Sequence, residues 1–414
     1  MEIKRLMDCC EFISDGDHLP PPKSEEGIPF ITISNITGQN KISFEDTMYV
    51  PESYYNGLNE NKKARKGDIL YSVVGSFGKP VYIDFDKKIV FQRHIAILRP
   101  KNNVNARFIY YTMLNPQFYK LIDKLAIGCS QRTVTLDALR NIELNLPDKD
   151  IQDKTVEVLS SIDKKIDENC KVNDNLEQQA KLLYDYWFTQ FDFPDKNGKP
   201  YRSSGGKMVW NEQLKRDIPD GWVTNPLSDI FTFKSGYSFS SDLYEVSGKY
   251  KLLTIKNVQS NGINLNVDNY INVLPDNVPD YCLLKAKDIL MSLTGNVGRV
   301  GIMYADNCLL NQRVALAEPV NINQRVFVYF LLKSDIIHKQ YEMIANGSSQ
   351  QNLSPIEAEK VIIAYNPEIA TKFSTLCNDY LNTIVSNLAE NQELIKLRDW
   401  LLPMLMNGQA TISD

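Results

Sequence analysis

Residues 150–190, DIQDKTVEVLSSIDKKIDENCKVNDNLEQQAKLLYDYWFTQ, are the stretch on which the organisation of this chain depends. They contain no proline and no glycine, and apolar or asparagine residues recur at alternating spacings of three and four. This spacing is typical of a coiled-coil seam, in which one helix packs lengthwise against another. The seam positions are Leu159, Ile162, Ile166, Asn169, Asn173, Leu176, Ala180, Leu183 and Trp187.

Two of these seam positions are asparagines, which fix the register of a helix against one partner helix at some cost in stability. A single surface helix is therefore the weaker interpretation. The same spacing recurs near the C-terminus, again with an asparagine, at Leu381, Ile384, Leu388, Asn391 and Ile395. We expect these two helices of one chain to pair with each other.

Length and composition are those of an ordinary multidomain protein. The 414 residues suffice for two or three domains, each with its own core. No apolar run reaches the roughly 18 to 20 residues of a membrane span, and the first ten residues, MEIKRLMDCC, lack the apolar segment of a signal peptide. The seven cysteines include no CxxC pair, which favours a reduced compartment over a disulfide framework or a zinc site. The sequence thus predicts a cytoplasmic protein that does not enter a membrane.

The formal net charge of −5 is distributed unevenly along the chain. Residues 1–150 carry a net charge of +1 and residues 201–365 are neutral, whereas residues 151–200 and 366–414 each carry −3. A nearly neutral globular unit can present one basic face to a nucleic acid. Acidic helices would be repelled by DNA and suit a protein partner or a spacer role.

The chain also repeats itself at an offset of about 220 residues. The matching segments are GDILYSVVGSFG (67–78) with KDILMSLTGNVG (287–298), FITISNI (30–36) with LLTIKNV (252–258), and GCSQRTVTLDALRNIELNLP (128–147) with GSSQQNLSPIEAEKVIIAYNP (347–367). At this offset, Gln92 and Arg93 fall on Gln312 and Arg313. Each copy precedes one long helix, so the predicted order is globular unit, helix, globular unit, helix.

Each globular unit is expected to be of the α+β class. Short runs such as ITISNI, DILYSVVG, KPVYIDF and IAILRP are typical of strands, and residues 107–122 and 325–341 of amphipathic helices. A segment rich in Pro, Gly, Ser and Asp follows the first long helix and predicts a linker. The predicted boundaries are a first domain at 1–149, a helix at 150–190, a linker at 191–215, a second domain at 216–366 and a second helix at 367–409.

Antiparallel pairing of the two helices would relate the two similar units by a pseudo-twofold axis and place them at opposite ends. Helices of roughly 35 to 40 residues are about 50 to 60 Å long. That separation suits two DNA half-sites spaced by about one helical turn or somewhat more. Because the two units differ, the half-sites would differ as well.

Motifs of catalysis are absent from the sequence. It has no GxxxxGK[ST] phosphate loop, no GxGxxG dinucleotide loop and no GxSxG elbow. Its three histidines, His18, His94 and His338, are not at metal-ligand spacing, which disfavours a zinc site or a His-based triad.

Two duplicated loops are candidates for contact with a nucleic acid. The glycine-rich loops at 75–78 and 295–298 contain Ser76 and Asn296 and precede Lys79 and Arg299, so their amides could approach a phosphate; the alternative is a strand-to-strand turn that needs positive φ. The G-x-S-Q turns could bond to phosphates or base edges, or could cap the short helix that follows. Their candidate residues are Ser130, Gln131, Arg132, Ser349, Gln350 and Gln351.

Further cations complete the candidate set. Arg93 and Arg313 sit in apolar strands, where each arginine either satisfies a buried carboxylate, the favoured interpretation, or points to a ligand. The run Lys62, Lys63, Arg65 and Lys66 is a solvated loop or a phosphate contact with salt-dependent affinity. Lys256 and Asn257, in LLTIKNV, are also candidates.

The whole chain resembles the DNA-specificity subunit of type I restriction-modification systems. The resemblance rests on LLYDYWFTQFDFPDKNGKPYRSSGGKMVW (182–210), IPDGW (218–222), LRDWLLPMLMNGQ (397–409), the duplicated GDIL and KDIL segments and the duplicated G-x-S-Q turns, all in the expected order. Two departures are small. Cys129 stands where the second turn has Ser348, and the second helix has a less regular seam.

The resemblance implies two target-recognition domains that each read one half of a split, asymmetric DNA sequence. The helices would act as a spacer and as the docking surface for two methyltransferase subunits, which use S-adenosylmethionine to methylate adenine N6. Two motor-nuclease subunits, with ATP and Mg, would join for cleavage. The chain itself would be non-catalytic and would hold no cofactor, in agreement with its lack of a [DN]PP[YF] motif.

Specificity is expected where the two copies differ, because motifs shared by both cannot distinguish two half-sites. The differing stretches are 37–66 against 259–286, and 13–28 against 231–251. Exchange of residues 37–66 should alter one half of the recognised sequence. Two other classes of function stay open: a scaffold whose duplicated domains bind proteins, and a self-contained restriction or modification enzyme, which the missing motifs disfavour.

Overall fold

The computed structural model describes residues 2–37, 40–129, 131–345 and 351–410. The chain divides into two compact units, which are described separately. Unit 1 comprises residues 1–166 and 394–414, and unit 2 comprises residues 167–393. Each unit therefore contains part of both long helices, α5 (Lys149–Tyr184) and α9 (Pro367–Met406). No helix in the described part of the chain combines the length and the apolar character needed to span a bilayer.

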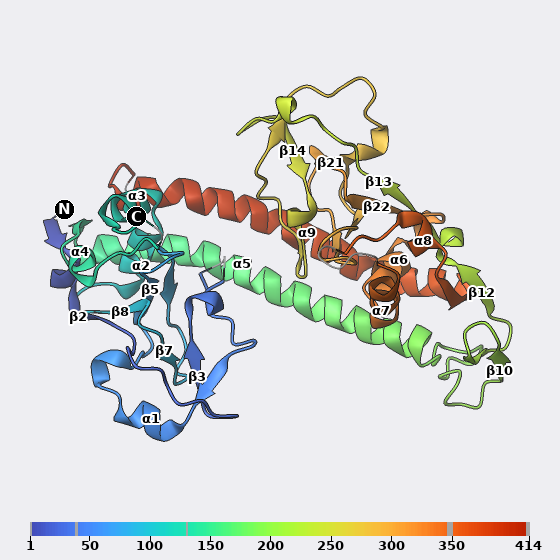
Figure 1. Cartoon of the computed structure of the whole chain (residues 1–414), viewed down its shortest axis with the longest axis horizontal. Coiled ribbons are helices and arrows are strands. Elements are labelled where there is room, and N and C mark those ends of the chain that lie inside the picture. Colours follow the sequence, from blue (N-terminus) through green and yellow to red (C-terminus); the bar gives the residue numbers. More distant parts are fainter. Residues whose placement is uncertain (1, 38–39, 130, 346–350, 411–414) are drawn as a thin grey trace. The chain divides into compact units, whose positions relative to one another are not determined.

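Unit 1 is built on a four-stranded antiparallel sheet with the order β2-β8-β5-β6, of which β2, β8 and β5 are labelled in Figure 1. Its strands are β2 (Cys10–Asp15), β8 (Ile95–Pro100), β5 (Ile69–Ser72) and β6 (Pro80–Tyr82). A second sheet, β4-β3-β7, consists of β4 (Met48–Val50), β3 (Ile28–Ile31) and β7 (Val90–Phe91), with β3 and β7 parallel. The other strands and the short α-helices are β1 (Glu2–Arg5) paired with β9 (Glu143–Leu146), α1 (Glu52–Gly57), α2 (Ala106–Leu114), α3 (Pro116–Leu125) and α4 (Leu136–Arg140).

Unit 2 repeats this plan. Its four-stranded sheet contains β13 (Phe231–Ser235), β22 (Val314–Pro319), β19 (Ile289–Ser292) and β20 (Val300–Ile302), and a second sheet contains β17 (Tyr270–Ile271), β14 (Tyr250–Leu253), β21 (Cys308–Leu310) and β18 (Leu283–Leu284). Other strands are β10 (Met208–Asn211), β11 (Arg216–Pro219), β12 (Val223–Pro226), β23 (Ile362–Tyr365), β15 (Val258–Gln259) and β16 (Gly262–Ile263). The short helices are α6 (Arg325–Leu332), α7 (Asp335–Ile344) and α8 (Pro355–Glu359).

The predicted internal repeat is confirmed in the main elements of the two units. The orders β2-β8-β5-β6 and β13-β22-β19-β20 match, the parallel pair β3 and β7 corresponds to β14 and β21, and α2, α3 and α4 correspond to α6, α7 and α8. The single helix expected at 107–122 is divided in two, because Asn115 caps α3 and Pro116 starts it. Its counterpart at 325–341 is divided at Ser334, which caps α7.

Asparagines join α5 to α9 inside unit 2. Asn169 Nδ2 donates to Asn391 Oδ1 at 2.9 Å, and Asn387 Nδ2 donates to Asn173 Oδ1 at the same distance. Within unit 1, Arg398 of α9 bonds to Asp163 of α5 at 3.0 Å. Residue numbers rise along α5 as they fall along α9, so the predicted antiparallel pairing is confirmed.

Most predicted seam residues are buried or partly buried, as the seam of a helix pair requires. Leu159, Ile162, Asn169, Asn173, Leu381, Ile384 and Asn391 are buried, and Ile166, Leu176, Leu183 and Leu388 are partly buried. Ile395 is a correction, because its side chain is 40% exposed. After Asn391 the inward positions continue at the partly buried Leu394 and Arg398, so the spacing at this point is three and then four.

The segment expected to be a linker contributes to the core of unit 2. Phe191 and Phe193 are buried, and both rings contact Trp222, with centroids at 5.3 and 5.2 Å. The hairpin of β10 and β11 begins within the same stretch. The aromatic residues at the start of the predicted linker therefore belong to the packed core of unit 2.

Candidate nucleic-acid interface

Three loops of unit 1 meet at one end of its four-stranded sheet, where β5 ends and β8 begins. They are residues 73–79 between β5 and β6, residues 92–94 between β7 and β8, and residues 127–129 and 131–134 before α4. Val73 N–H donates to His94 O at 2.9 Å, Val134 N–H to Val73 O at 2.8 Å and Gly75 N–H to Arg132 O at 3.0 Å. We call these loops the first loop cluster.

Unit 2 contains the same arrangement. Leu293 N–H donates to Arg313 O at 2.9 Å, Leu353 N–H to Leu293 O at 2.8 Å and Gly295 N–H to Gln351 O at 2.9 Å. We call residues 293–299, 311–313 and 351–353 the second loop cluster. In both units the glycine-rich loop is thus hydrogen-bonded to the residue that directly follows the G-x-S-Q motif, Arg132 in unit 1 and Gln351 in unit 2.

A buried serine holds each glycine-rich loop in place. Ser72 Oγ donates to Ser76 O at 3.0 Å and accepts from Lys79 N–H at 2.9 Å. Ser292 does the same with Asn296 O and with Arg299 N–H. These serines are 0% and 1% exposed. Because the hydroxyl bonds lie out of competition with water, they fix the loop conformation.

The glycines of these loops have the positive φ that a tight turn requires. Gly75 and Gly78 have φ of 68° and 90°, and Gly295 and Gly298 have φ of 77° and 79°. The N–H groups of Gly75 and Gly78 are bonded within the unit, to Arg132 O and Ser72 O. These two amides therefore serve the turn rather than a phosphate, which supports the turn interpretation of the loop.

An aromatic pair and an arginine stiffen the first loop cluster. The ring of Phe77 stacks on Tyr119 with a centroid distance of 5.9 Å, and the Arg132 guanidinium lies 5.5 Å from the Phe77 centroid. Arg132 also bonds to the carboxylate and the backbone carbonyl of Asp123. The charge of Arg132 is thus partly compensated, although its side chain remains 43% exposed.

The turns do not cap the following helices. Thr135 Oγ1 accepts the N–H of Ala138 and caps α4, and Ser354 occupies the N-cap position of α8. Gln131, Arg132 and Gln351 lie before these caps and are exposed. Ser130, Ser349 and Gln350 lie outside the described residues.

Arg93 and Arg313 differ from the prediction in two ways. Both lie in turns, because β7 ends at Phe91 and β21 ends at Leu310, and both are exposed. Neither forms an ion pair with any residue that the structure describes, so the buried-carboxylate interpretation is wrong. Burial and the neighbouring Arg93 guanidinium lower the pKa of His94.

The alignment of these two turns also needs correction. His94 O and Arg313 O accept the equivalent hydrogen bonds, which makes Arg93 equivalent to Gln312 rather than to Arg313. The preceding strands support this alignment. Phe91 pairs with Ile31 of β3, and Leu310 pairs with the equivalent Leu253 of β14. The physical reason is that the segment between the glycine-rich loop and this turn is one residue shorter in unit 2.

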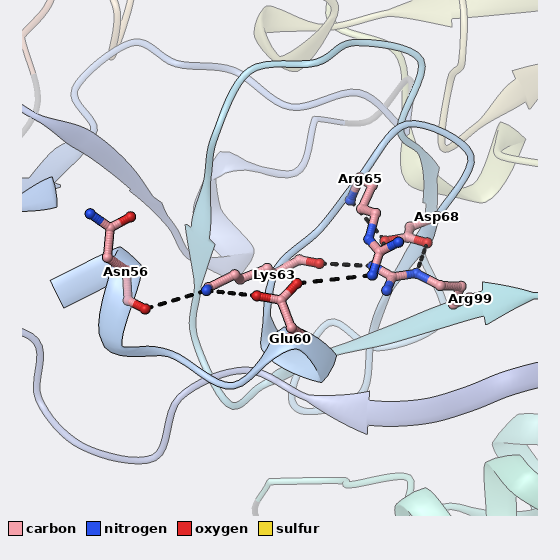
Figure 2. A network of polar contacts seen from close by, with 6 residues as sticks. All are labelled: Asn56, Glu60, Lys63, Arg65, Asp68 and Arg99. Carbon is pink, nitrogen blue, oxygen red and sulfur yellow. Dashed lines mark hydrogen bonds and ion pairs between the residues drawn. The ribbon is translucent and has the colours of Figure 1, made fainter. Parts of the chain in front are cut away.

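Two residues of the basic run of unit 1, Lys63 and Arg65, lie beside a buried ion pair (Figure 2). Arg99 donates to Asp68 Oδ1 at 2.9 Å and Oδ2 at 2.7 Å, and it also donates to Lys63 O. Both side chains are less than 10% exposed. Burial opposes the charge of Arg99, but its bonds to Asp68 outweigh that effect and raise its pKa. Sequence reasoning missed Arg99, although an arginine in the apolar strand IAILRP was a signal for a buried acid.

Within the run itself, three cations have acidic neighbours. Lys63 bonds to Glu60 at 2.9 Å, Lys62 bonds to Asp17 at 3.2 Å and Arg65 lies 3.9 Å from Glu60. Lys66 is exposed and forms no ion pair within the described ranges. The run therefore supports the local fold more than it presents a continuous basic surface.

Asn257 is a correction to the candidate set. It is buried, its Oδ1 accepts the N–H of Thr254 at 2.9 Å and its Nδ2 donates to Asn264 O and Asn266 O, so it has no group left for a base. Lys256 is exposed and bonds to Asp268 at 2.9 Å. The duplicated Thr-x-x-Asn, at Thr32 and Thr254, is the capping-box signal that would have revealed this role.

Comparison with known proteins identifies similar chains. A family model described as the type I restriction modification DNA specificity domain matches residues 1–178 and 219–385. The Type I restriction enzyme HindI specificity subunit of Haemophilus influenzae is 25% identical over 404 residues, covering 84% of this chain and 87% of that protein. The Type I restriction enzyme MjaIX specificity subunit of Methanocaldococcus jannaschii is 25% identical over 430 residues, covering 100% and 94%.

A solved structure has a similar fold. The crystal structure of a type I restriction-modification system S subunit from M. genitalium matches with a TM-score of 0.57 at 19% identity, covering 100% of this chain and 96% of that one. Each matched region of the family model contains one loop cluster.

Proposed function

Because this chain belongs to the family of type I restriction-modification DNA specificity domains, we propose that it selects the DNA sequence on which a type I complex acts. Each unit would read one half of a split, asymmetric site with its loop cluster. The two halves would differ because the two units present different side chains on the same backbone framework.

The observation that carries this proposal is the duplicated loop cluster. The same hydrogen bonds hold both clusters, through Ser72 in one unit and Ser292 in the other. A fixed backbone lets a few exposed side chains approach DNA with a defined geometry. Those exposed residues are Ser76, Arg93, Gln131 and Arg132 in the first cluster and Asn296, Gln312, Arg313 and Gln351 in the second.

Lys79 and Arg299 are suited to phosphate contact. They occupy equivalent positions directly after the glycine-rich loops, are partly exposed and carry the same charge. A cation shared by both units cannot distinguish two half-sites, but it can fix the position of each unit on the DNA backbone. Binding through such contacts weakens as salt concentration rises.

The chemistry would belong to partner subunits. We expect two methyltransferase subunits with S-adenosylmethionine, which would methylate adenine N6, and two motor-nuclease subunits with ATP and Mg for cleavage. The acidic net charge of residues 151–200 and 366–414 suits protein partners better than DNA. Leu397 and Trp400 of α9 are 44% and 60% exposed, and an exposed apolar pair of this kind supports a docking role for the end of that helix.

The test compares the methylated sequences of cells with and without this gene. The proposal expects one split methylated motif that disappears with the gene. In vitro, the complex assembled with its methyltransferase subunits should bind a duplex bearing that motif, and log Kd should depend linearly on log salt. Lys79→Gln and Arg299→Gln should each reduce that slope by about one.

Lys196→Gln is the matched control, because Lys196 is exposed and lies outside both loop clusters. It should leave the slope unchanged. Absence of both a gene-dependent motif and salt-dependent DNA binding would refute the proposal in favour of a scaffold that binds only proteins.

A further inference from the structure

The turns between β7 and β8 and between β21 and β22 hold different side chains at equivalent positions. In unit 1, Arg93 N–H donates to Asp17 O at 3.2 Å, and in unit 2, Gln312 N–H donates to Tyr237 O at 3.0 Å. Asp17 and Tyr237 in turn form equivalent parallel bridges to Gln92 and Asn311. The sequence alignment had paired two identical Gln-Arg dipeptides and so hidden this difference.

The backbone of each turn is held closely by the chain before it. A Cβ atom added to Gly16 would lie 2.2 Å from Phe91 O, and one added to Gly236 would lie 2.1 Å from Asn311 O. Only glycine permits such an approach. Further hydrogen bonds, Gln92 N–H to Ile31 O at 2.9 Å and Asn311 N–H to Leu253 O at 3.1 Å, tie each turn to the second sheet. The two turns are therefore rigid platforms.

The side chains of Arg93 and Gln312 are free to bind a ligand. Both are exposed, and neither forms a side-chain hydrogen bond or an ion pair with another described residue. Asp17, whose backbone carbonyl accepts the Arg93 N–H, has its carboxylate occupied, because it accepts from Tyr54 Oη and from Lys62 Nζ at 3.2 Å. Because the Asp17 carboxylate already has these partners, the Arg93 guanidinium remains available to bind a ligand.

The location is also suited to DNA. The carbonyl of His94 accepts from Val73 N–H at the start of the loop that follows β5, and that of Arg313 accepts from Leu293 N–H at the start of the loop that follows β19. Lys79 and Arg299 lie at the far end of those loops and can contact phosphates. A residue in the turn would then lie beside a DNA backbone contact, where base edges come within reach.

The chemistry of the two side chains differs in a way that selects bases. Arginine bonds in a bidentate manner to O6 and N7 of guanine, and glutamine bonds in a bidentate manner to N6 and N7 of adenine in the major groove. Building on the proposed function, we propose that Arg93 reads a guanine in one half-site and that Gln312 reads an adenine at the equivalent place in the other.

The test determines the methylated motif in cells that express the wild-type chain, Arg93→Gln or Gln312→Arg. Arg93→Gln should change or relax one guanine in one half of the motif and leave the other half unchanged. Gln312→Arg should act on the opposite half, at an adenine. Arg5→Gln is the matched control, because Arg5 is an exposed arginine of β1 outside the loop cluster, and it should leave the motif intact.

A binding measurement keeps the test independent of methylation. For the assembled complex, Arg93→Gln replaces the two donors that guanine O6 and N7 accept with a side chain that pairs with adenine, so discrimination between the motif and its guanine-to-adenine form should fall by about tenfold or more. An unchanged motif in both turn variants, with methylation intact, overturns this inference while leaving the proposed function standing. A wild-type chain that confers no split motif overturns both.

Discussion

Asn169 donates a hydrogen bond from Nδ2 to Oδ1 of Asn391 at 2.9 Å, and both side chains are less than 10% exposed. Each asparagine would cost stability if buried alone, because an unpaired buried amide loses its bonds to water. Together they are satisfied at one alignment of α5 and α9. A shift of either helix by one turn would separate them, so the pair specifies the register.

We therefore expect Asn391→Leu to destabilise the full chain by about 1–3 kcal/mol, since it leaves the Asn169 amide with fewer partners. The double variant with Asn169→Leu should lose less than the sum of the two single changes. Urea unfolding followed by circular dichroism measures both. Asn175→Leu, at an exposed position of α5, is the control and should change stability by about 0.5 kcal/mol or less. Strict additivity would contradict coupling between the two asparagines.

The buried pair of Arg99 and Asp68 gives a second prediction. Arg99→Met removes both hydrogen bonds and leaves a buried carboxylate, so the free energy of unfolding should fall by about 3–5 kcal/mol. Arg65→Met, at an exposed arginine of the same network, should cost about 0–1 kcal/mol. Denaturant unfolding of the purified chain distinguishes the two variants. Equal losses of unfolding free energy would show that the buried ion pair contributes no more to stability than the exposed one.

Asp288, the counterpart of Asp68 in unit 2, forms no ion pair with an arginine that the structure describes, and we expect it to affect stability in the opposite way. Asp288 corresponds to Asp68, but Glu318 stands where Arg99 would be, and burial raises the pKa of Asp288 above its ordinary value of 3.8. Lys285 and Arg325 act to lower that pKa, while Glu318 acts to raise it. The folded state therefore holds a proton that the unfolded state has released, and stability falls as pH rises from about 3.8 towards the raised pKa.

Asp288→Asn should remove this part of the pH dependence and should not reduce stability at pH 7, since an amide oxygen can still accept from Lys285 N–H. Asp68→Asn, the same change in unit 1, should destabilise the chain because Arg99 loses its counter-charge. Thermal unfolding between pH 4 and pH 7 compares the two variants. A loss of similar size in both would contradict the difference between the units.

Periodicity revealed the helices and the repeat, but side-chain partners were harder to predict. The spacing of three and four located the seam because buried positions of paired helices must recur on one face. It failed at Ile395, where Arg398 bonds to Asp163 and the inward positions change spacing. The capping-box spacing from Thr254 signalled one role of Asn257, but the sequence does not show that the carbonyls of Asn264 and Asn266 accept from its side-chain amide.

The equivalence of Arg93 and Gln312 could not be read from the sequence either. The identical Gln-Arg pairs at 92–93 and 312–313 were aligned with each other, which is one residue out of register. The backbone hydrogen bonds give the correct alignment. The loops themselves were predicted well, because glycine at a positive φ leaves a clear pattern. The sequence did not predict that these loops lie together at one end of the sheet, because that depends on the strand order, which sequence patterns do not determine.

The exposed end of α9 offers a prediction about assembly. Trp400→Ala removes a large apolar side chain that is 60% exposed, so the stability of the isolated chain should change little. If this residue docks a methyltransferase subunit, its loss should weaken that binding by about tenfold or more, as for other exposed tryptophans at interfaces. Calorimetric titration of the chain with that subunit measures the effect. Trp210→Ala, at another exposed tryptophan, provides the comparison, and equal affinity for wild type and Trp400→Ala would exclude the site.

The first glycine-rich loop provides a last prediction, at Gly78. An added Cβ would lie 2.5 Å from Cε2 of Tyr119, and the φ of 90° is unfavourable for any other residue. Gly78→Ala should therefore displace the loop from Tyr119 and misplace Lys79, which follows it directly. We expect weaker binding of the assembled complex to its DNA motif, by about tenfold, because a phosphate contact and its position are lost together. Gly57→Ala is the matched control, since no atom lies within 4 Å of its added Cβ and its φ is not positive. Binding by both variants should be measured at two salt concentrations. A Gly78→Ala complex that binds as tightly as the Gly57→Ala complex at both would mean that the first glycine-rich loop does not touch DNA.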